Sequence, residues 1–143
     1  MNIKLNIKKS YFNEVYLPYL NNTERFTVFY GGAGSGKSVF VCQKLILKLL
    51  KYPKRTLLVI RKVSASLRDS IYQEFITHLT KFGLIDYCKV MGSSLTIYLP
   101  NESKIIFKGI DDIMIEEATE ITLDDFTQLN LRLRSKAENQ QIT

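Results

Sequence analysis

Eight consecutive residues have the composition and spacing of a phosphate-binding loop. They read Gly31-Gly32-Ala33-Gly34-Ser35-Gly36-Lys37-Ser38 and satisfy the pattern Gly-x-x-x-x-Gly-Lys-Ser/Thr, known as Walker A or the P-loop. In such a loop, backbone N–H groups surround the phosphate oxygens, the lysine reaches the β- and γ-phosphates, and the hydroxyl binds Mg²⁺. We therefore expect all eight residues to bind nucleotide, Lys37 also to act in catalysis and Ser38 to hold the metal. The alternative is a glycine-rich turn with an incidental lysine.

Two acids further along the chain could complete this chemistry. Glu116 and Glu117 follow the apolar run Ile113-Met114-Ile115, which has the form of a buried strand ending in a Walker-B motif. The first acid would hold Mg²⁺ directly or through water, and the second would deprotonate the attacking water. Asp111-Asp112 compete for this role, but Lys108 and Gly109 interrupt the strand before them.

The segments around the loop predict the elements that position it. Residues 25–30 are aromatic and β-branched enough for a strand, and residues 39–50 are apolar at helical spacing. Residues 56–60 form a continuous apolar run that predicts a buried parallel strand. Arg61 follows it at the edge where open α/β sheets bind ligands. Arg61 could contact phosphate or DNA, or could belong to an ordinary charged loop.

The remaining chain predicts a few further elements. Residues 66–82 predict a helix that Gly83 ends, and residues 95–99 and 104–108 predict a hairpin with a four-residue turn. A last helix follows the capping residues 122–125. The first 20 residues read as a short strand or arm followed by a short helix. That segment could place an aromatic ring or an amide against adenine, or could simply cover the sheet edge.

Composition narrows the class of protein. The chain has 143 residues, 45% of them hydrophobic, which suits a single globular domain. No apolar run is long enough for a bilayer, so we expect an intracellular protein without membrane association. Cys42, Cys88 and the single histidine, His78, indicate neither a disulfide framework nor a zinc site.

The net charge of +6 is unevenly distributed. Residues 1–62 hold 12 Lys/Arg against 2 Asp/Glu, a net charge of +10, and residues 63–143 hold 8 against 12. A basic half that contains the glycine-rich loop suits a polyanionic partner, either nucleotide alone or nucleotide with nucleic acid. A solvated basic surface is the alternative.

Taken together, three segments resemble the large terminase subunit of tailed bacteriophages: Tyr30 to Ser38, Val59-Ile60-Arg61-Lys62 with the following Ser66 to Ser70, and Ile115 to Glu120. The resemblance implies a P-loop NTPase of the RecA-like, additional-strand type, with a mainly parallel sheet flanked by helices and a β-hairpin insertion. It implies an ATPase motor, fuelled by Mg-ATP, that drives double-stranded DNA into a procapsid. Lys37 and Ser38 would lie at the phosphates and metal, Glu116 at the metal, and Glu117 would be the catalytic carboxylate. The implied partners are DNA, the portal protein, the small terminase subunit and other copies in a ring, in the host cytoplasm at the procapsid portal.

The sequence departs from that family in two ways. Members of that family continue with a coupling motif and a nuclease domain, whereas the sequence stops at residue 143, so we expect residues 1–143 to be an ATPase domain incomplete at its C-terminal end. Only residues 109–112 separate the hairpin from the Glu116 strand, whereas a parallel neighbour needs a crossover of about a dozen residues. Either these strands are antiparallel, or a segment is missing near 109–112. Two other functions stay open: a non-hydrolysing nucleotide-binding or assembly module, and a P-loop kinase.

Overall fold

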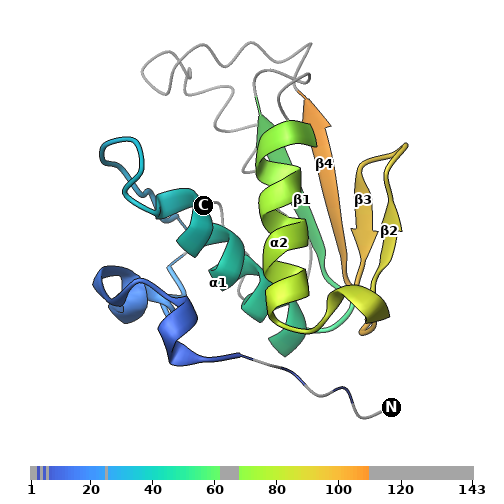
Figure 1. The fold of residues 1–143 in the computed structure, drawn as a ribbon, viewed down its shortest axis with the longest axis horizontal. Helices are drawn as coiled ribbons and strands as arrows, with labels where there is room; N and C mark the ends of the chain where they lie inside the picture. Colours follow the sequence, from blue (N-terminus) through green and yellow to red (C-terminus); the bar gives the residue numbers. More distant parts are fainter. Residues whose placement is uncertain (1–2, 4, 6, 25, 62–67, 110–143) are drawn as a thin grey trace.

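A computed structural model describes residues 3, 5, 7–24, 26–61 and 68–109 of the chain. These residues form a mixed α/β arrangement (Figure 1). In chain order the elements are η1 (Lys9–Tyr11), η2 (Glu14–Tyr19), α1 (Lys37–Lys51), β1 (Thr56–Arg61), the π-helical turn η4 (Arg68–Tyr72), α2 (Gln73–Lys81), η5 (Ile85–Tyr87), β2 (Lys89–Met91), β3 (Thr96–Tyr98) and β4 (Lys104–Gly109). We call residues 9–20, which contain η1 and η2, the N-terminal arm, and residues 31–38 the glycine-rich loop.

The four strands form one sheet in the order β1-β4-β3-β2. β1 and β4 run parallel, while β3 is antiparallel to both β4 and β2. The predicted hairpin is confirmed as β3 and β4, and a hydrogen bond of 2.8 Å from the Leu99 N–H to the Ser103 carbonyl closes its turn. The described sheet is mixed rather than mainly parallel, because β3 and β2 continue it with antiparallel pairing on the side of β4 away from β1.

The two faces of the sheet differ. Figure 1 shows α1 and α2 on one face of the sheet. Leu57 and Val59 of β1 pack against the core on that side. Leu58 alternates with them and is 51% exposed, since successive side chains of a strand point to opposite faces. The predicted parallel strand over 56–60 is thus confirmed as β1, which pairs in parallel with β4, but within the described residues it is buried on one face only.

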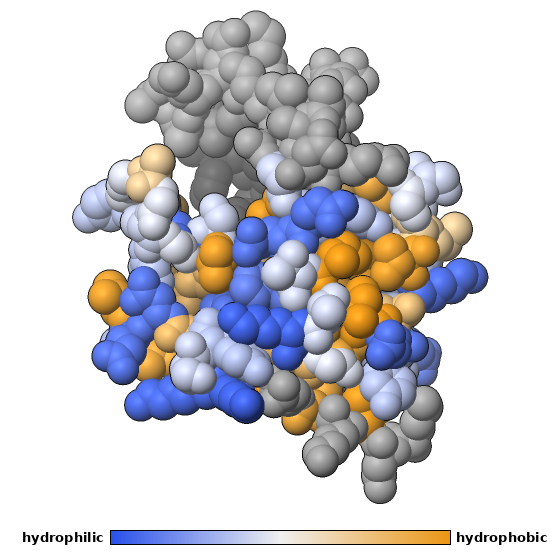
Figure 2. Space-filling view, viewed as in Figure 1, coloured by the Kyte–Doolittle hydropathy of each residue, from blue (hydrophilic) through white to orange (hydrophobic). Residues whose placement is uncertain are grey.

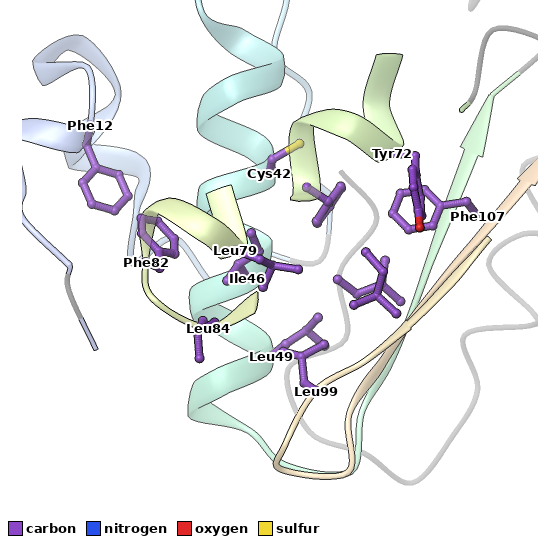
Figure 3. Packing of buried hydrophobic residues seen from close by; sticks show 13 residues of the cluster. Phe12, Cys42, Ile46, Leu49, Tyr72, Leu79, Phe82, Leu84, Leu99 and Phe107 are labelled. Atoms are coloured by element: carbon purple, nitrogen blue, oxygen red, sulfur yellow. The ribbon is translucent and has the colours of Figure 1, made fainter. Parts of the chain in front are cut away.

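The core lies between the two helices and the sheet (Figure 3). Phe107 of β4 meets Tyr72 and Phe75 edge to face, with ring centroids 5.1 and 5.4 Å apart, an arrangement that aromatic pairs favour. From the arm, Phe12 is buried against Phe82 at 6.2 Å. One core thus joins the arm, both helices and the sheet.

The predicted helix over 66–82 is observed from Arg68 to Lys81 as η4 followed directly by α2, and it ends where expected. Phe82 is its C-cap, and Gly83 follows with a φ of 73°. The Gly83 N–H donates to the Thr80 carbonyl and the Leu84 N–H to the Leu79 carbonyl, at 2.9 and 2.8 Å. This pair of bonds is the Schellman motif, which satisfies carbonyls at the end of the helix.

The strand expected over residues 25–30 does not form in the described residues. Phe26 makes a single bridge, residues 27–30 have no regular structure, and Tyr30 is 91% exposed. Residues with high strand propensity form a strand only where they can pair with a neighbouring strand, and none of β1 to β4 pairs with this segment. The expected strand at 113–117, the helix after 122–125 and the start of the helix at 66–67 lie outside the described residues.

In the described parts of the chain, no helix has the length and apolar character that crossing a bilayer requires.

Candidate functional site: the glycine-rich loop

The glycine-rich loop leads directly into the N-terminus of α1. The helix begins at Lys37, two residues earlier than predicted, and Gly36 is its N-cap with a φ of 79°. A side chain at Gly36 would be strained in this conformation, and a β-carbon there would lie 3.7 Å from Nδ2 of Asn13. Glycine therefore allows the loop to turn into the helix while the arm lies close by.

Lys37 folds back across the loop that precedes it. Its Nζ donates to the carbonyls of Gly31 and Gly32, each at 2.7 Å, and to Oγ of Ser35 at 2.8 Å. These three bonds curl the loop into a ring around the ammonium group. The positive charge thus lies next to a helix N-terminus, where unsatisfied N–H groups and the helix dipole also favour an anion.

A cavity of about 590 Å³ lies beside the first turn of α1. Ser38 lines it from α1, Ile60 from the end of β1, and the other lining residues come from η4 and α2: Ser70, Ile71, Gln73, Glu74 and Thr77. The structure thus brings the predicted metal-binding hydroxyl to the carboxyl end of β1. Hydrophilic side chains gather over α2 on the face shown in Figure 2.

Glu74 is the one carboxylate among the described residues that line this cavity. It lines the cavity together with Ser38, and one of its oxygens lies 2.8 Å from Nε2 of His78 on the next turn of α2. His78 is buried on α2. The sequence did not predict Glu74 at the cavity. The polar residues of α2 follow the helical period, but that pattern does not tell which of them lie beside the glycine-rich loop.

The N-terminal arm contacts the loop from the other side. Tyr16 donates a hydrogen bond of 3.0 Å from its hydroxyl to the carbonyl of Ser35, and its ring stacks on Phe40 of α1 with centroids 5.1 Å apart. The arm is expected either to cover the sheet edge or to contact adenine. The ring contacts and hydrogen bonds described for it are to the loop, α1, Phe29 and Phe82 rather than to a strand, and adenine contact stays a prediction. The direct contact with the loop was missed, because the two partners are 19 positions apart in the sequence and no periodic pattern connects them.

Of the other predicted site residues, the structure describes only the backbone of Arg61. Arg61 is the last residue of β1, where its backbone pairs with Gly109, and its side chain is outside the described atoms. Glu116 and Glu117, together with their competitors Asp111 and Asp112, lie outside the described residues. Their roles stay predictions. Among the residues that the structure does describe, no group of three or more His, Cys, Asp or Glu side chains could hold a metal ion.

Comparison with known proteins shows which family this chain belongs to. The model of the phage terminase large subunit family matches residues 23–143. The PBSX phage terminase large subunit of Bacillus subtilis (strain 168) is 36% identical over 135 residues, which cover 85% of this chain and 31% of that protein. The terminase large subunit of Bacillus phage SPP1 is 33% identical over 87 residues, 60% of this chain and 20% of that protein. The chain thus spans less than a third of the length of these relatives. With most of its length matched by the family model, the chain belongs to the phage terminase large subunit family.

Proposed function

We propose that the glycine-rich loop binds Mg-ATP and that the chain hydrolyses it as the motor of a DNA-packaging terminase. The observation that carries the proposal is the position of Lys37, whose ammonium group lies within the ring of the loop at the start of α1. A phosphate group would be attracted to this position by the lysine charge and the free N–H groups of the helix N-terminus. On binding, Lys37 would exchange its three hydrogen bonds to the loop for bonds to phosphate oxygens. Membership of the terminase family supports the same function.

Each residue of the site has a part in this proposal. The loop backbone from Gly31 to Gly36 would hold the phosphates, and Lys37 would bind their oxygens and offset the charge that develops during cleavage. Ser38 Oγ, at the cavity, would hold Mg²⁺ together with Glu116. When bound, Mg²⁺ would neutralise phosphate charge, and Glu117 would orient and deprotonate the attacking water. Arg61, at the end of β1, would contact a phosphate. The sheet would belong to a P-loop NTPase fold of the additional-strand type.

The partners of the motor are part of the same proposal. The substrate that it moves would be double-stranded DNA, and the portal protein and the small terminase subunit would assemble with a ring of these chains in the host cytoplasm. The net charge of +10 in residues 1–62 supports a polyanionic partner. DNA-stimulated turnover should therefore fall steeply as salt is raised, because phosphate contacts release counterions.

The test is ATP binding and steady-state turnover of the chain, with and without double-stranded DNA. We expect Lys37→Ala to weaken Mg-ATP binding by roughly 10- to 100-fold, the effect of losing charged hydrogen bonds, and Glu117→Gln to keep binding while losing turnover. Lys51→Ala, at the exposed end of the same helix, is the matched control and should leave both unchanged.

The outcomes separate the three functions. Turnover that responds to DNA and disappears in Glu117→Gln supports the motor. Binding without turnover, alone and with DNA, supports the non-hydrolysing module, and phosphate transfer to an added acceptor supports a kinase. A chain that binds no nucleotide would rule out the proposal.

A further inference from the structure

Tyr16 reaches the glycine-rich loop at one backbone atom. Its hydroxyl donates to the Ser35 carbonyl at 3.0 Å, which is good geometry for a hydrogen bond. The Ser35 carbonyl belongs to the peptide unit that joins Ser35 to Gly36. In a planar trans peptide the C=O and the N–H point in opposite directions, so the bond to Tyr16 directs the Gly36 N–H away from the arm.

The tyrosine ring is itself held in place. It stacks on Phe40 and meets Phe29 edge to face, with centroids 6.1 Å apart, and Phe29 in turn contacts Phe40 at 5.5 Å. Phe40 is 1% exposed. This aromatic cluster therefore connects the hydroxyl of Tyr16 to the first turn of α1, which follows the loop directly.

The arm as a whole is anchored to the same helix. Gln43, one turn beyond Phe40, donates from Nε2 to the Tyr11 carbonyl at 2.7 Å. Asn13 caps η2 by accepting a hydrogen bond of 3.1 Å from the Val15 N–H, and it lies close to Gly36. The arm thus has a fixed position relative to α1 and can impose that position on the loop.

From these contacts we propose that Tyr16 is a positioning residue of the nucleotide site. It fixes the Ser35–Gly36 peptide of the glycine-rich loop so that the Gly36 N–H is already directed at a bound phosphate. The proposal rests on the nucleotide binding proposed above and adds a residue outside the Gly-x-x-x-x-Gly-Lys-Ser pattern. Because the loop is ordered before binding, the nucleotide does not have to fix this peptide itself, and affinity increases through preorganisation.

The test compares Tyr16→Phe with Tyr19→Phe. Tyr16→Phe keeps the aromatic ring and removes only the hydroxyl. Tyr19 lies in the same 3-10 helix and packs on Phe29 at 6.1 Å, and within the described ranges its hydroxyl makes no hydrogen bond. Mg-ADP affinity is measured by calorimetry, ATP turnover by steady-state kinetics, and exchange of the Gly36 amide proton by NMR without nucleotide.

We expect Tyr16→Phe to weaken Mg-ADP binding by about 3- to 10-fold, the range for one lost hydrogen bond, and to raise KM for ATP by a similar factor while kcat changes little. The Gly36 amide should exchange faster in this variant, with an unchanged melting temperature. Tyr19→Phe should match the wild type in every measurement.

Equal Mg-ADP affinity in Tyr16→Phe and the wild type would overturn the proposal. So would a loss of affinity that appears equally in Tyr19→Phe, since that would indicate general loosening of the arm. If the wild type binds no Mg-ADP, the proposed function fails, and Tyr16 is then not a positioning residue of a nucleotide site. The exchange of the Gly36 amide still reports, without nucleotide, whether the Tyr16 hydroxyl holds the Ser35–Gly36 peptide.

Discussion

Lys44 is an unusual residue of α1, because its amine is buried. The side chain is 3% exposed, and its Nζ has no hydrogen-bond partner among the described residues. Burial lowers the pKa of Lys44 below its usual value. Lys48 lies one turn away, and burial together with the charges of Lys44 and Arg55 lowers its pKa to about 8. A charged amine in this position costs free energy of folding.

We predict that Lys44→Met stabilises the fold near neutral pH. Methionine has a similar shape and no charge, so the free energy of unfolding should rise by about 1 kcal/mol, which corresponds to roughly 2 to 4 °C in the melting temperature. The folded-state pKa of Lys44 is lowered, so at alkaline pH the unfolded chain binds more protons than the native one. Wild-type stability therefore rises with pH as native Lys44 loses its proton, up to the unfolded pKa of about 10.4.

Thermal melts at pH 7 and pH 10 check this prediction. The advantage of Lys44→Met should shrink between the two pH values, while the exposed Lys51→Met should differ from wild type by less than about 0.5 kcal/mol at both. A lower melting temperature for Lys44→Met at pH 7 would show that the Lys44 charge is compensated.

At the scale of elements, the end of α2 depends on one glycine. Gly83 has a φ of 73°, in the left-handed region that costs other residues energy. We predict that Gly83→Ala lowers the free energy of unfolding by about 1 kcal/mol, measured by urea denaturation. Gly92 follows β2, and a β-carbon added there would meet nothing within 4 Å. Gly92→Ala should therefore change stability little, and equal losses in the two variants would argue against the cap.

The elements that sequence predicted well are those with strong local patterns. The helix expected over 39–50 is observed as Lys37–Lys51, and the hairpin, its turn and the glycine stop of α2 lie where expected. Cys42 is buried and Cys88 is partly buried. Burial of Cys42, with a smaller effect of the Glu74 charge, raises its thiol pKa to about 12, so this thiol is unreactive.

The elements that sequence missed depend on distant partners. β2 has only three residues, too few for an alternating pattern to stand out. The strand expected at 25–30 has high intrinsic propensity but no paired neighbour in the described sheet. The contact between Tyr16 and Ser35 joins a short 3-10 helix to an irregular loop, and neither segment has a sequence pattern that predicts which way its side chains point. The sequence therefore predicted the glycine-rich loop itself, but it did not predict that the N-terminal arm packs against this loop.

Viewed as a whole molecule, the described fold has a single core and an open sheet face. Phe107 lies opposite Val59 in the register of β4 and β1, and both point toward the helices. Leu58, between Leu57 and Val59, points to the other side. The helices are therefore held to the sheet from one face only.

We predict that Phe107→Ala lowers the free energy of unfolding by about 3 to 5 kcal/mol, because it leaves a cavity beneath Tyr72 and Phe75. Typical domains are stable by about 5 to 15 kcal/mol, so this loss is large. Leu58→Ala, on the neighbouring strand but the opposite face, should cost less than about 1 kcal/mol. Guanidinium unfolding of both variants checks the difference, and a cost below about 1 kcal/mol for Phe107→Ala would contradict the central place of β4 in the core.

The packing of the arm also bears on where the folding unit begins. The family match starts at residue 23, yet the core already includes Phe12, and Tyr16 contacts the glycine-rich loop. A boundary set at the match would remove a buried aromatic ring from against Phe82 and leave its hydrophobic surface open to water. The smallest fragment that retains both this core residue and the loop contact must therefore start no later than Phe12, well ahead of the first residue that family similarity marks.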